Sequence, residues 1–321
     1  MEVIFADESC GFLSANRKKT SNSSPKISTI TPMKRILKID DWFHPDGFPI
    51  SIERREPQGE FDPHAHEFAE LVIVTGGSGL HVAGQDSWGL TAGDVFVISG
   101  PRMHEYRDLC DLRLVNVIYQ PDLLKMRLLD LTAVPGYHAL FTLEPTRRLR
   151  RSSMGRLRLN PRELVHVTGL VDRLELELAA REPGFGFMAT AAFMQLIGQL
   201  ARTYGRSSSP DDRALLRIGE ALSHLERSIH AEVNLDELAA IAHMSRRSFQ
   251  RVFQSATGSS PLSWQIGRRI QRACGLLCHS DKRVTEIAFE VGFNDSNYFT
   301  RQFRRMTGLS PREFRMRQGM A

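Results

Sequence analysis

Four side chains in the first half of the chain have the residue types and spacing of a ligand-binding site: His64, His66, Glu70 and His104. His64, His66 and Glu70 are separated by even numbers of residues, so a regular strand without a bulge would point all three to one face. Imidazole nitrogens and a carboxylate can hydrogen-bond the hydroxyl groups of a small polyol or sugar. They can equally ligate a divalent metal, or form a satisfied polar cluster that holds no ligand.

The surrounding sequence predicts the β-rich domain that would position these residues. Between Ile50 and Pro121, short apolar and β-branched runs alternate with glycines, and this even spacing predicts a sandwich or a barrel. The predicted strands are Glu70–Thr75, Val95–Ser99 and Leu112–Tyr119, and the predicted turns lie at Gly76-Gly77, Gly84, Gly93 and Gly100. The aromatic residues expected near the site are Phe68, Trp88 and Tyr106.

Helices are predicted after the strands. One helix begins near Pro161 and ends before Pro183-Gly184, and a second covers roughly Gly186–Tyr204. The first helix has an apolar stripe in steps of three and four residues, made of Leu164, Val167, Val171, Leu174 and Leu178. Such a stripe most often packs on its own domain, and it can instead form the seam of a dimer.

The last third of the chain contains an internal repeat. Glu237–Phe253 recurs as Glu286–Phe303, at an offset of 49 residues at the start and 50 at the end, and each copy is followed by Thr-Gly-x-Ser-Pro. Each copy has the pattern of a short helix, a tight turn and a second helix. The predicted N-caps of the second helices are Ser245 and Asp295, and the glycines that end them are Gly258 and Gly308.

The second helix of each copy presents a polar face suited to reading DNA. Phe249 and Phe253 in the first copy, like Phe299 and Phe303 in the second, are one turn apart and must face the core. The residues left outward are Arg246, Arg247, Gln250 and Arg251 in the first copy and Ser296, Asn297, Thr300 and Arg301 in the second. Arginine, glutamine and asparagine make bidentate contacts to guanine and adenine in the major groove. A plain helical bundle with a solvated polar face is the alternative.

Charge favours the DNA interpretation. From Arg213 to the end there are 17 Lys or Arg against 10 Asp or Glu, a net charge of +7 within a chain whose total is +5. A basic C-terminal third on a slightly acidic body is typical of a separate domain that binds a polyanion.

The repeat closely resembles the DNA-binding domain of the AraC/XylS family of bacterial regulators. The resemblance covers about 100 residues and includes the family's linker helix at Arg268–Leu277 and its signature at Ile287–Phe303. It implies that one polypeptide places two recognition helices in successive major grooves on one face of double-stranded DNA. It also implies contact with RNA polymerase and dimerisation through the N-terminal half.

A second resemblance concerns the β-rich half. His64-Ala-His66-x-x-x-Glu70 with Pro101-x-x-His104 is similar to the cupin motif pair, and further stretches resemble regulators of L-rhamnose operons. This resemblance implies a monosaccharide effector, with L-rhamnose as the leading candidate, and assigns the four residues to the lining of its pocket. A metal-dependent cupin enzyme carrying a DNA-binding tail is the alternative.

The fold expected from these patterns is α+β, a cupin-like β-barrel with flanking helices followed by an all-α double helix-turn-helix domain. The predicted parts are a disordered leader over 1–32, a sensor and dimerisation domain over 33–204, a linker over 205–212 and a DNA-binding domain over 213–321. No signal peptide or bilayer-spanning stretch is recognised. We therefore expect a cytoplasmic, non-enzymatic homodimer without a cofactor or resident metal.

Overall fold

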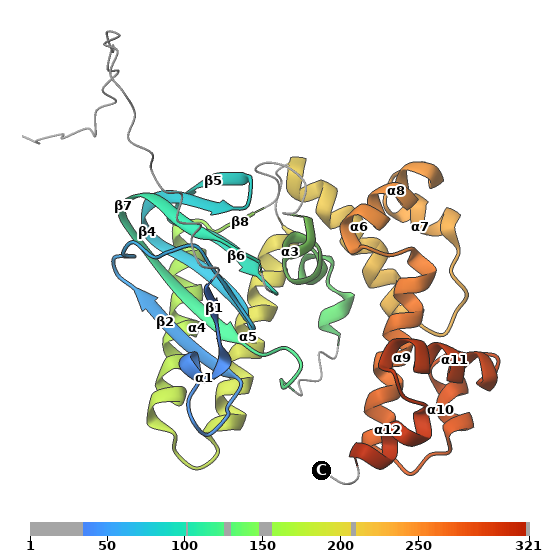
Figure 1. Cartoon of the computed structure of the whole chain (residues 1–321). Coiled ribbons are helices and arrows are strands. Elements are labelled where there is room, and N and C mark those ends of the chain that lie inside the picture. The colour runs from blue at the N-terminus through green and yellow to red at the C-terminus, as the bar shows by residue number, and fades with distance from the viewer. Residues whose placement is uncertain (1–34, 101, 125–129, 148–155, 207–209, 319–321) are drawn as a thin grey trace, which may run out of the picture. The chain divides into compact units, whose positions relative to one another are not determined.

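A computed structural model describes residues 35–318 of the chain, apart from 101, 125–129, 148–155 and 207–209. The predicted leader over 1–32 lies outside the described residues. The architecture is α+β, as predicted: a strand-rich domain comes first and an all-helical region follows (Figure 1).

The main sheet has the strand order β2-β7-β4-β6-β8, with β5 paired to β4, and all of these pairings are antiparallel. A short parallel pair, β1 with β3, lies beside it. The strands are β1 Arg35–Leu37, β2 Ile50–Arg55, β3 His64–His66, β4 Ala69–Ala83, β5 Asp86–Thr91, β6 Asp94–Ile98, β7 Glu105–Tyr119 and β8 Leu157–Arg158. A short helix, α1 (Ile39–Trp42), separates β1 from β2.

The predicted turn at Gly76-Gly77 is wrong, because β4 runs straight through it. Its pairing with β7 shifts register between Val74 and Leu80, which marks a bulge inside one long strand. Gly77 has φ +64, and a Cβ there would lie 1.9 Å from the carbonyl oxygen of Asp111. Glycine is therefore required at position 77, and Gly76 and Gly77 belong to a bulge within the strand instead of reversing the chain.

Two long helices, α4 (Pro161–Ala180) and α5 (Phe185–Gly205), pack together and lie side by side behind the sheet in Figure 1. Asn160 caps α4 in a capping box with Glu163, which explains where the helix begins. Val167, Val171 and Leu174 are fully buried in one cluster with the sheet. The stripe thus packs within its own chain, and the hypothesis that it forms a dimer seam is wrong for these residues.

Shorter turns of helix lie between β7 and β8 in the chain and contact α5 and α6. They are η1 Leu131–Ala133, α2 Pro135–Tyr137, η2 His138–Leu143 and α3 Glu144–Arg147. The helical region consists of α6 Pro210–Arg227, α7 Leu235–Ile241, α8 Arg246–Thr257, α9 Pro261–His279, α10 Val284–Glu290, α11 Ser296–Thr307 and α12 Pro311–Gln318. Because α6 begins at Pro210, helix extends into the stretch expected to be linker.

Both copies of the repeat form a helix-turn-helix, α7–α8 and α10–α11. The Ser245 hydroxyl accepts from the backbone N–H of Ser248, and the Asp295 carboxylate accepts from two N–H groups at the start of α11. Gly258 and Gly308 both have φ +76 and end α8 and α11. The four predicted caps are confirmed, and the prolines after them each open the next helix at its first turn.

Candidate functional site

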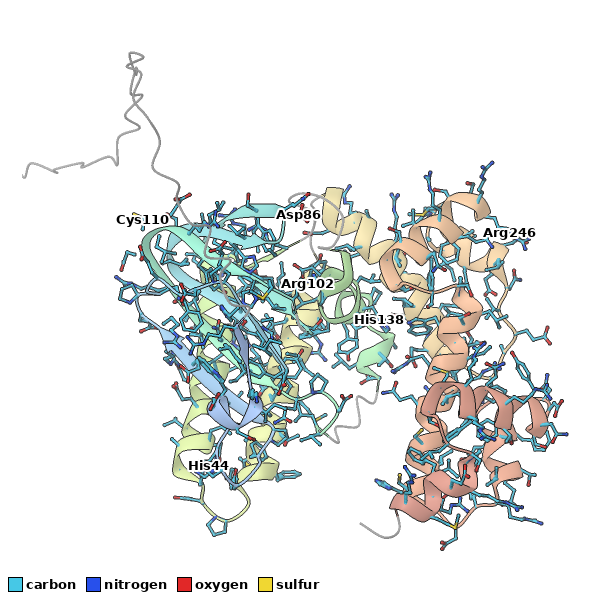
Figure 2. The ribbon with its side chains drawn as sticks, viewed as in Figure 1. His44, Asp86, Arg102, Cys110, His138 and Arg246 are labelled. Atoms are coloured by element: carbon cyan, nitrogen blue, oxygen red, sulfur yellow. The ribbon has the colours of Figure 1, made fainter. Side chains whose placement is uncertain are left out.

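The outward faces of α8 and α11 form the candidate DNA interface. Phe249, Phe253, Phe299 and Phe303 have no exposed surface, which confirms the predicted inward face of each helix. In the first copy all four predicted residues (Arg246, Arg247, Gln250 and Arg251) are exposed. Arg246 projects outward from α8 in Figure 2 and pairs with Asp236 at 3.2 Å. The first recognition helix therefore presents a row of long polar side chains.

The second recognition helix is less uniform. Asn297 and Arg301 are exposed, while Ser296 and Thr300 are half-buried. The Thr300 hydroxyl donates to the Ser296 carbonyl at 2.9 Å, so part of its hydrogen-bonding capacity is used inside the helix. Tyr298, which the sequence reasoning did not select, is exposed, and the Arg301 guanidinium lies 5.7 Å from its ring centre. The two faces differ in composition, as the sequence indicated.

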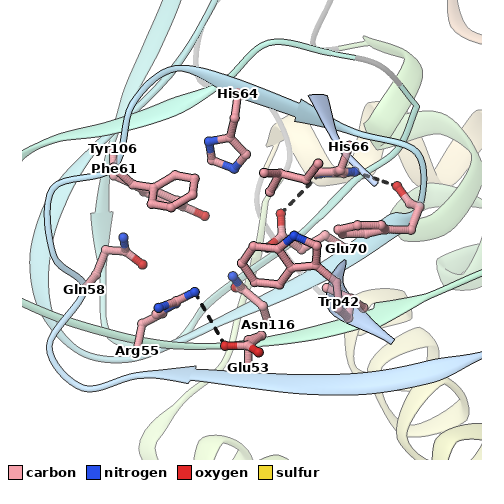
Figure 3. A pocket seen from close by; sticks show the side chains of 13 residues that line it. Trp42, Glu53, Arg55, Gln58, Phe61, His64, His66, Glu70, Tyr106 and Asn116 are labelled. Atoms are coloured by element: carbon pink, nitrogen blue, oxygen red, sulfur yellow. Dashed lines mark hydrogen bonds and ion pairs between the residues drawn. The ribbon is translucent and has the colours of Figure 1, made fainter. Parts of the chain in front are cut away.

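The candidate effector site is a pocket inside the strand-rich domain (Figure 3). Its lining consists of Leu37, Trp42, Glu53, Arg55, Gln58, Phe61, His64, His66, Phe68, Glu70, Tyr106, Asn116 and Ile118. The free cavity is about 30 Å³, room for roughly two water molecules. A monosaccharide therefore enters only if lining side chains move.

Strand alternation explains which residues reach this pocket. On β2, Ile50 and Ile52 pack into the cluster shared with the helices, and Arg54 on that face pairs with Asp172 and Glu175 of α4. The other face of β2 supplies Glu53 and Arg55 to the pocket. On β7, Asn116 lies directly opposite Glu53 in the strand register and belongs to the same inward row.

Three of the four predicted site residues converge on one point. The ligand atoms of His66, Glu70 and His104 lie within 4.8 Å of one another. Glu70 Oε2 is 3.3 Å from His66 Nε2 and 3.7 Å from His104 Nε2. His64 lies beside this group, with its ring centre 4.3 Å from that of His104. His64 and His66 lie on β3, Glu70 lies on β4, and His104 pairs with His64 in an isolated β-bridge. The four residues therefore do not come from the single regular strand that the even spacing assumed.

The backbone fixes the tautomers of the three imidazoles. Nδ1 of His64, His66 and His104 lies 3.0, 2.6 and 3.1 Å from the carbonyl oxygens of Asp62, Phe68 and Arg102 respectively. A carbonyl only accepts, so each Nδ1 carries a hydrogen and each neutral ring keeps a lone pair on Nε2. His66 Nε2, His104 Nε2 and Glu70 Oε2 are buried and find no hydrogen-bond donor among the described residues.

The electrostatics favour an ionised Glu70 carboxylate beside neutral rings of His64 and His104. Burial lowers the pKa of His104 to about 4, and burial also lowers the pKa of His64. Burial alone would raise the pKa of the Glu70 carboxyl, but its hydrogen-bond contact with His66, followed by the charge interactions with His66, His104 and His64, holds that pKa below its usual value. Near pH 7 the Glu70 carboxylate and the Nε2 atoms of His64 and His104 are thus hydrogen-bond acceptors. The cluster is complementary to hydroxyl donors, and its ligand types also suit a divalent metal.

Sequence reasoning found the histidines and Glu70 but missed several lining residues: Trp42, Glu53, Arg55, Gln58, Phe61 and Asn116. Of the three expected aromatic residues, Phe68 and Tyr106 line the pocket. Trp88 instead packs in a tilted arrangement against the buried ring of His81, 4.2 Å away between ring centres. The two-residue spacing of Ile50 and Ile52, which places Glu53 and Arg55 on the alternate positions of the strand, was the available signal for these two residues.

Comparison with known proteins extends these observations. Residues 50–225 match the AraC-like ligand binding domain, and residues 238–317 match a helix-turn-helix domain. The HTH-type transcriptional activator RhaR of Escherichia coli strain K12 is 34% identical over 282 residues, covering 88% of this chain and 96% of that protein. RhaR of Enterobacter sp. strain 638 is 32% identical, covering 89% and 98%.

Among solved structures, the DNA-binding domain of AdpA in complex with a target DNA is 39% identical, with a TM-score of 0.30. It covers 31% of this chain and 90% of that one.

A ligand-binding domain joined to two helix-turn-helix units defines a DNA-binding transcription regulator that responds to an effector. The chain belongs to the AraC family. Its curated relatives are transcription regulators. No helix among the described residues is both long and apolar enough to cross a membrane.

Proposed function

We propose that this regulator senses a monosaccharide, with L-rhamnose as the first candidate, and activates genes of carbohydrate metabolism. It acts in the cytoplasm as a homodimer that contacts RNA polymerase, and its sensor domain performs no chemistry. The relatives named transcriptional activators support the direction of regulation. The resemblance of 64–72 and 114–119 to regulators of L-rhamnose operons supports the choice of sugar.

The chemistry of the pocket carries the sugar assignment. One wall offers buried acceptors, the Nε2 atoms of His66 and His104 and the carboxylate of Glu70. Arg55 supplies donors on the opposite side, while Gln58 and Asn116 can both donate and accept. Aromatic rings complete the lining. A sugar has hydroxyls that donate and accept, together with apolar C–H faces, so it is complementary to all three kinds of surface.

A thermal-shift panel of monosaccharides tests the sensor assignment. At least one sugar should raise the melting temperature of the full chain, and Arg55→Met and Glu70→Gln should abolish that increase. Arg54→Met is the matched control, because Arg54 is the neighbouring arginine on the opposite face of β2 and pairs with α4. A panel in which no sugar stabilises the protein contradicts the sensor assignment.

For DNA recognition, we assign one major groove to Arg246, Arg247, Gln250 and Arg251, and the next to Ser296, Asn297, Thr300 and Arg301. Dimerisation would pair two such readers on repeated half-sites. The exposed apolar residues Val165 and Leu176 on α4 and Phe187 and Met188 on α5 are the surface proposed for it. Leu176→Glu should then halve the mass measured by sedimentation equilibrium, whereas a monomeric wild type contradicts the dimer.

A divalent metal is the second candidate ligand, favoured by the convergence of His66, Glu70 and His104. Zinc bonds of about 2.1 Å place tetrahedral ligands about 3.4 Å apart, close to the 3.3 and 3.7 Å observed around Glu70 Oε2. The Nδ1 bonds to backbone carbonyls are the outer-shell contacts that metal-ligating histidines make. Such a metal would supply Lewis acidity to a bound hydroxyl or carbonyl group.

Metal analysis separates the two ligands. If a metal resides here, purified protein contains it stoichiometrically, and Glu70→Gln loses it. Glu53→Gln, which neutralises another carboxylate of the same pocket, should retain it. If the purified protein contains no metal, and a sugar stabilises it whereas divalent ions do not, the metal candidate is excluded. The alternative of a metal-dependent enzyme is then excluded as well.

A further inference from the structure

The two helix-turn-helix units have separate apolar cores within the part of the chain that the structure describes. Phe249 and Phe253 of α8 belong to one cluster, and Phe299 and Phe303 of α11 belong to another. The second cluster is completed by α9, which joins the units. Trp264 of α9 also packs against the first cluster, so α9 is an apolar link between the two units. The polar contacts that α9 makes with the segment preceding α7 add to this link and contribute to the orientation of α8 relative to α11.

Two side chains of α9 hold the segment that precedes α7. The Arg269 guanidinium donates from Nε to the carbonyl of Ile229 at 2.7 Å and from Nη2 to the carbonyl of Ala231 at 2.8 Å. The Gln265 amide donates to the carbonyls of Ser228 and Ala231 at 3.3 and 3.1 Å. Both side chains are buried, with 9% and 1% of their surface exposed. Segment 228–231, which leads into the first unit, is thus tied to α9.

The second unit reaches the same guanidinium from its own turn. Arg269 Cζ lies 5.7 Å from the ring centre of Phe293, in the turn between α10 and α11. The preceding residue, Gly292, has φ +95, and a Cβ there would lie 2.9 Å from the Cα of His230 and 3.1 Å from Arg269 Cζ. The turn of the second unit therefore packs directly on segment 228–231 and on Arg269.

We propose that Arg269 is a positioning residue that fixes α11 relative to α8 and thereby determines which spacing between two DNA segments the protein accepts. Two recognition helices on one rigid body fit one spacing. Each base pair inserted between the segments moves one of them by about 3.4 Å and rotates it by about 35°. A hydrogen bond does not survive such a displacement. Without the contacts of Arg269, the two helix-turn-helix units could move relative to each other and follow the displaced DNA segment.

Selection of binding sites from randomised double-stranded DNA tests this proposal with the full chain. Within each half-site, wild-type protein should enrich two short sequence elements at one fixed separation. Duplexes carrying these elements at that separation, and at one base pair more or less, are then compared in direct binding. Arg269→Met should reduce the preference for the selected separation about tenfold, the factor expected for losing hydrogen bonds from one charged donor. The base preferences within each element should stay unchanged.

Further variants separate positioning from folding. Arg272→Met is the matched control, because Arg272 lies three residues further along α9 and pairs with Glu226 instead. It should keep the wild-type spacing preference. Arg269→Lys keeps the positive charge and N–H donors but lacks the planar fork that presents two separate nitrogens to the two carbonyls, so it should restore part of the preference. Gln265→Met supplies an independent test, because it removes the two hydrogen bonds to Ser228 and Ala231 with a side chain of similar size. The amide oxygen has no hydrogen-bond partner among the described residues, so its removal breaks no further contact.

Each outcome bears on the proposal. Relaxed spacing in Arg269→Met and Gln265→Met, with melting temperatures close to that of the wild type, supports it. An unchanged spacing preference in a folded Arg269→Met protein overturns it. Equal loss of affinity at all separations, in both variants, also overturns it, because that result assigns the two residues to fold stability or to backbone contact.

Discussion

Acid should destabilise the protein through one buried histidine outside both sites, His138 in η2, which Figure 2 labels. Its Nε2 donates to the carbonyl of Thr132 at 2.9 Å, and its Nδ1 lies 3.3 Å from the Thr142 hydroxyl, which can donate to it. Both contacts suit a neutral ring. Burial lowers the pKa of His138 from 6.5 to about 4. The folded protein therefore resists protonation that the unfolded chain accepts.

The sign and size of the effect follow from the pKa of His138 in the unfolded chain, 6.5, and in the folded protein, about 4. Between pH 6.5 and 4 the unfolded chain binds more protons at this position, so stability falls as the pH falls. The contribution lost relative to neutral pH is about 2 kcal/mol at pH 5 and approaches about 3 kcal/mol at pH 4. Because burial also lowers the pKa of His104 to about 4, the wild type alone cannot isolate His138. The comparison with His138→Gln can.

Urea unfolding at pH 7, 6 and 5, followed by tryptophan fluorescence, measures this difference. At pH 7, His138→Gln should be less stable than wild type by about 1–2 kcal/mol, because a buried hydrogen bond is lost. By pH 5 that gap should close or reverse. A variant at the exposed His166 should follow the wild type throughout. A stability difference between wild type and His138→Gln that stays constant from pH 7 to 5 refutes the reasoning.

Two further predictions concern DNA reading and the sheet. Arg251→Ala or Arg301→Ala should cost about 1–3 kcal/mol of discrimination at base pairs in one groove, measured by competition between matched and mismatched duplexes; equal weakening on every sequence would instead assign the arginine to phosphate. Gly93 has φ +92, and a Cβ there would lie 2.4 Å from the Leu159 carbonyl oxygen, so Gly93→Ala should lower the unfolding free energy by more than about 1 kcal/mol. The matched Gly59→Ala, whose Cβ meets nothing within 4 Å, should have little effect, and equal losses in the two variants would contradict the prediction.

Local chemistry explains which features could be predicted from the sequence. The recognition helices follow from helical spacing and caps, since Ser245, Phe249 and Gly258 all act within one helix and its two ends. The convergence of His66 with Glu70 was predicted from even spacing on one regular strand, and this reason is incomplete. They lie on β3 and β4, with Glu67 and Phe68 outside both strands, and the fold around the pocket brings them together.

The remaining features depend on contacts far apart in the chain. Glu53 and Arg55 lie on the positions of β2 that alternate with Ile52 and Arg54, but only the packing of α4 on the other face of β2 shows that these two point into the pocket. Gly77 has a positive φ, which serves a turn and a bulge equally, so its local signal could not separate them. Arg269 belongs to a segment recognised as a linker helix, and its contacts with segment 228–231 are set by tertiary structure.

The affinity of the full chain for its selected DNA, measured with and without the stabilising monosaccharide, tests most directly whether the protein is an effector-responsive regulator. The predicted result is a change in DNA affinity of about 5- to 150-fold, with the same factor appearing in the sugar affinity when DNA is present. Equal DNA affinity with and without saturating sugar would contradict the account, because the pocket and the recognition helices would then be uncoupled.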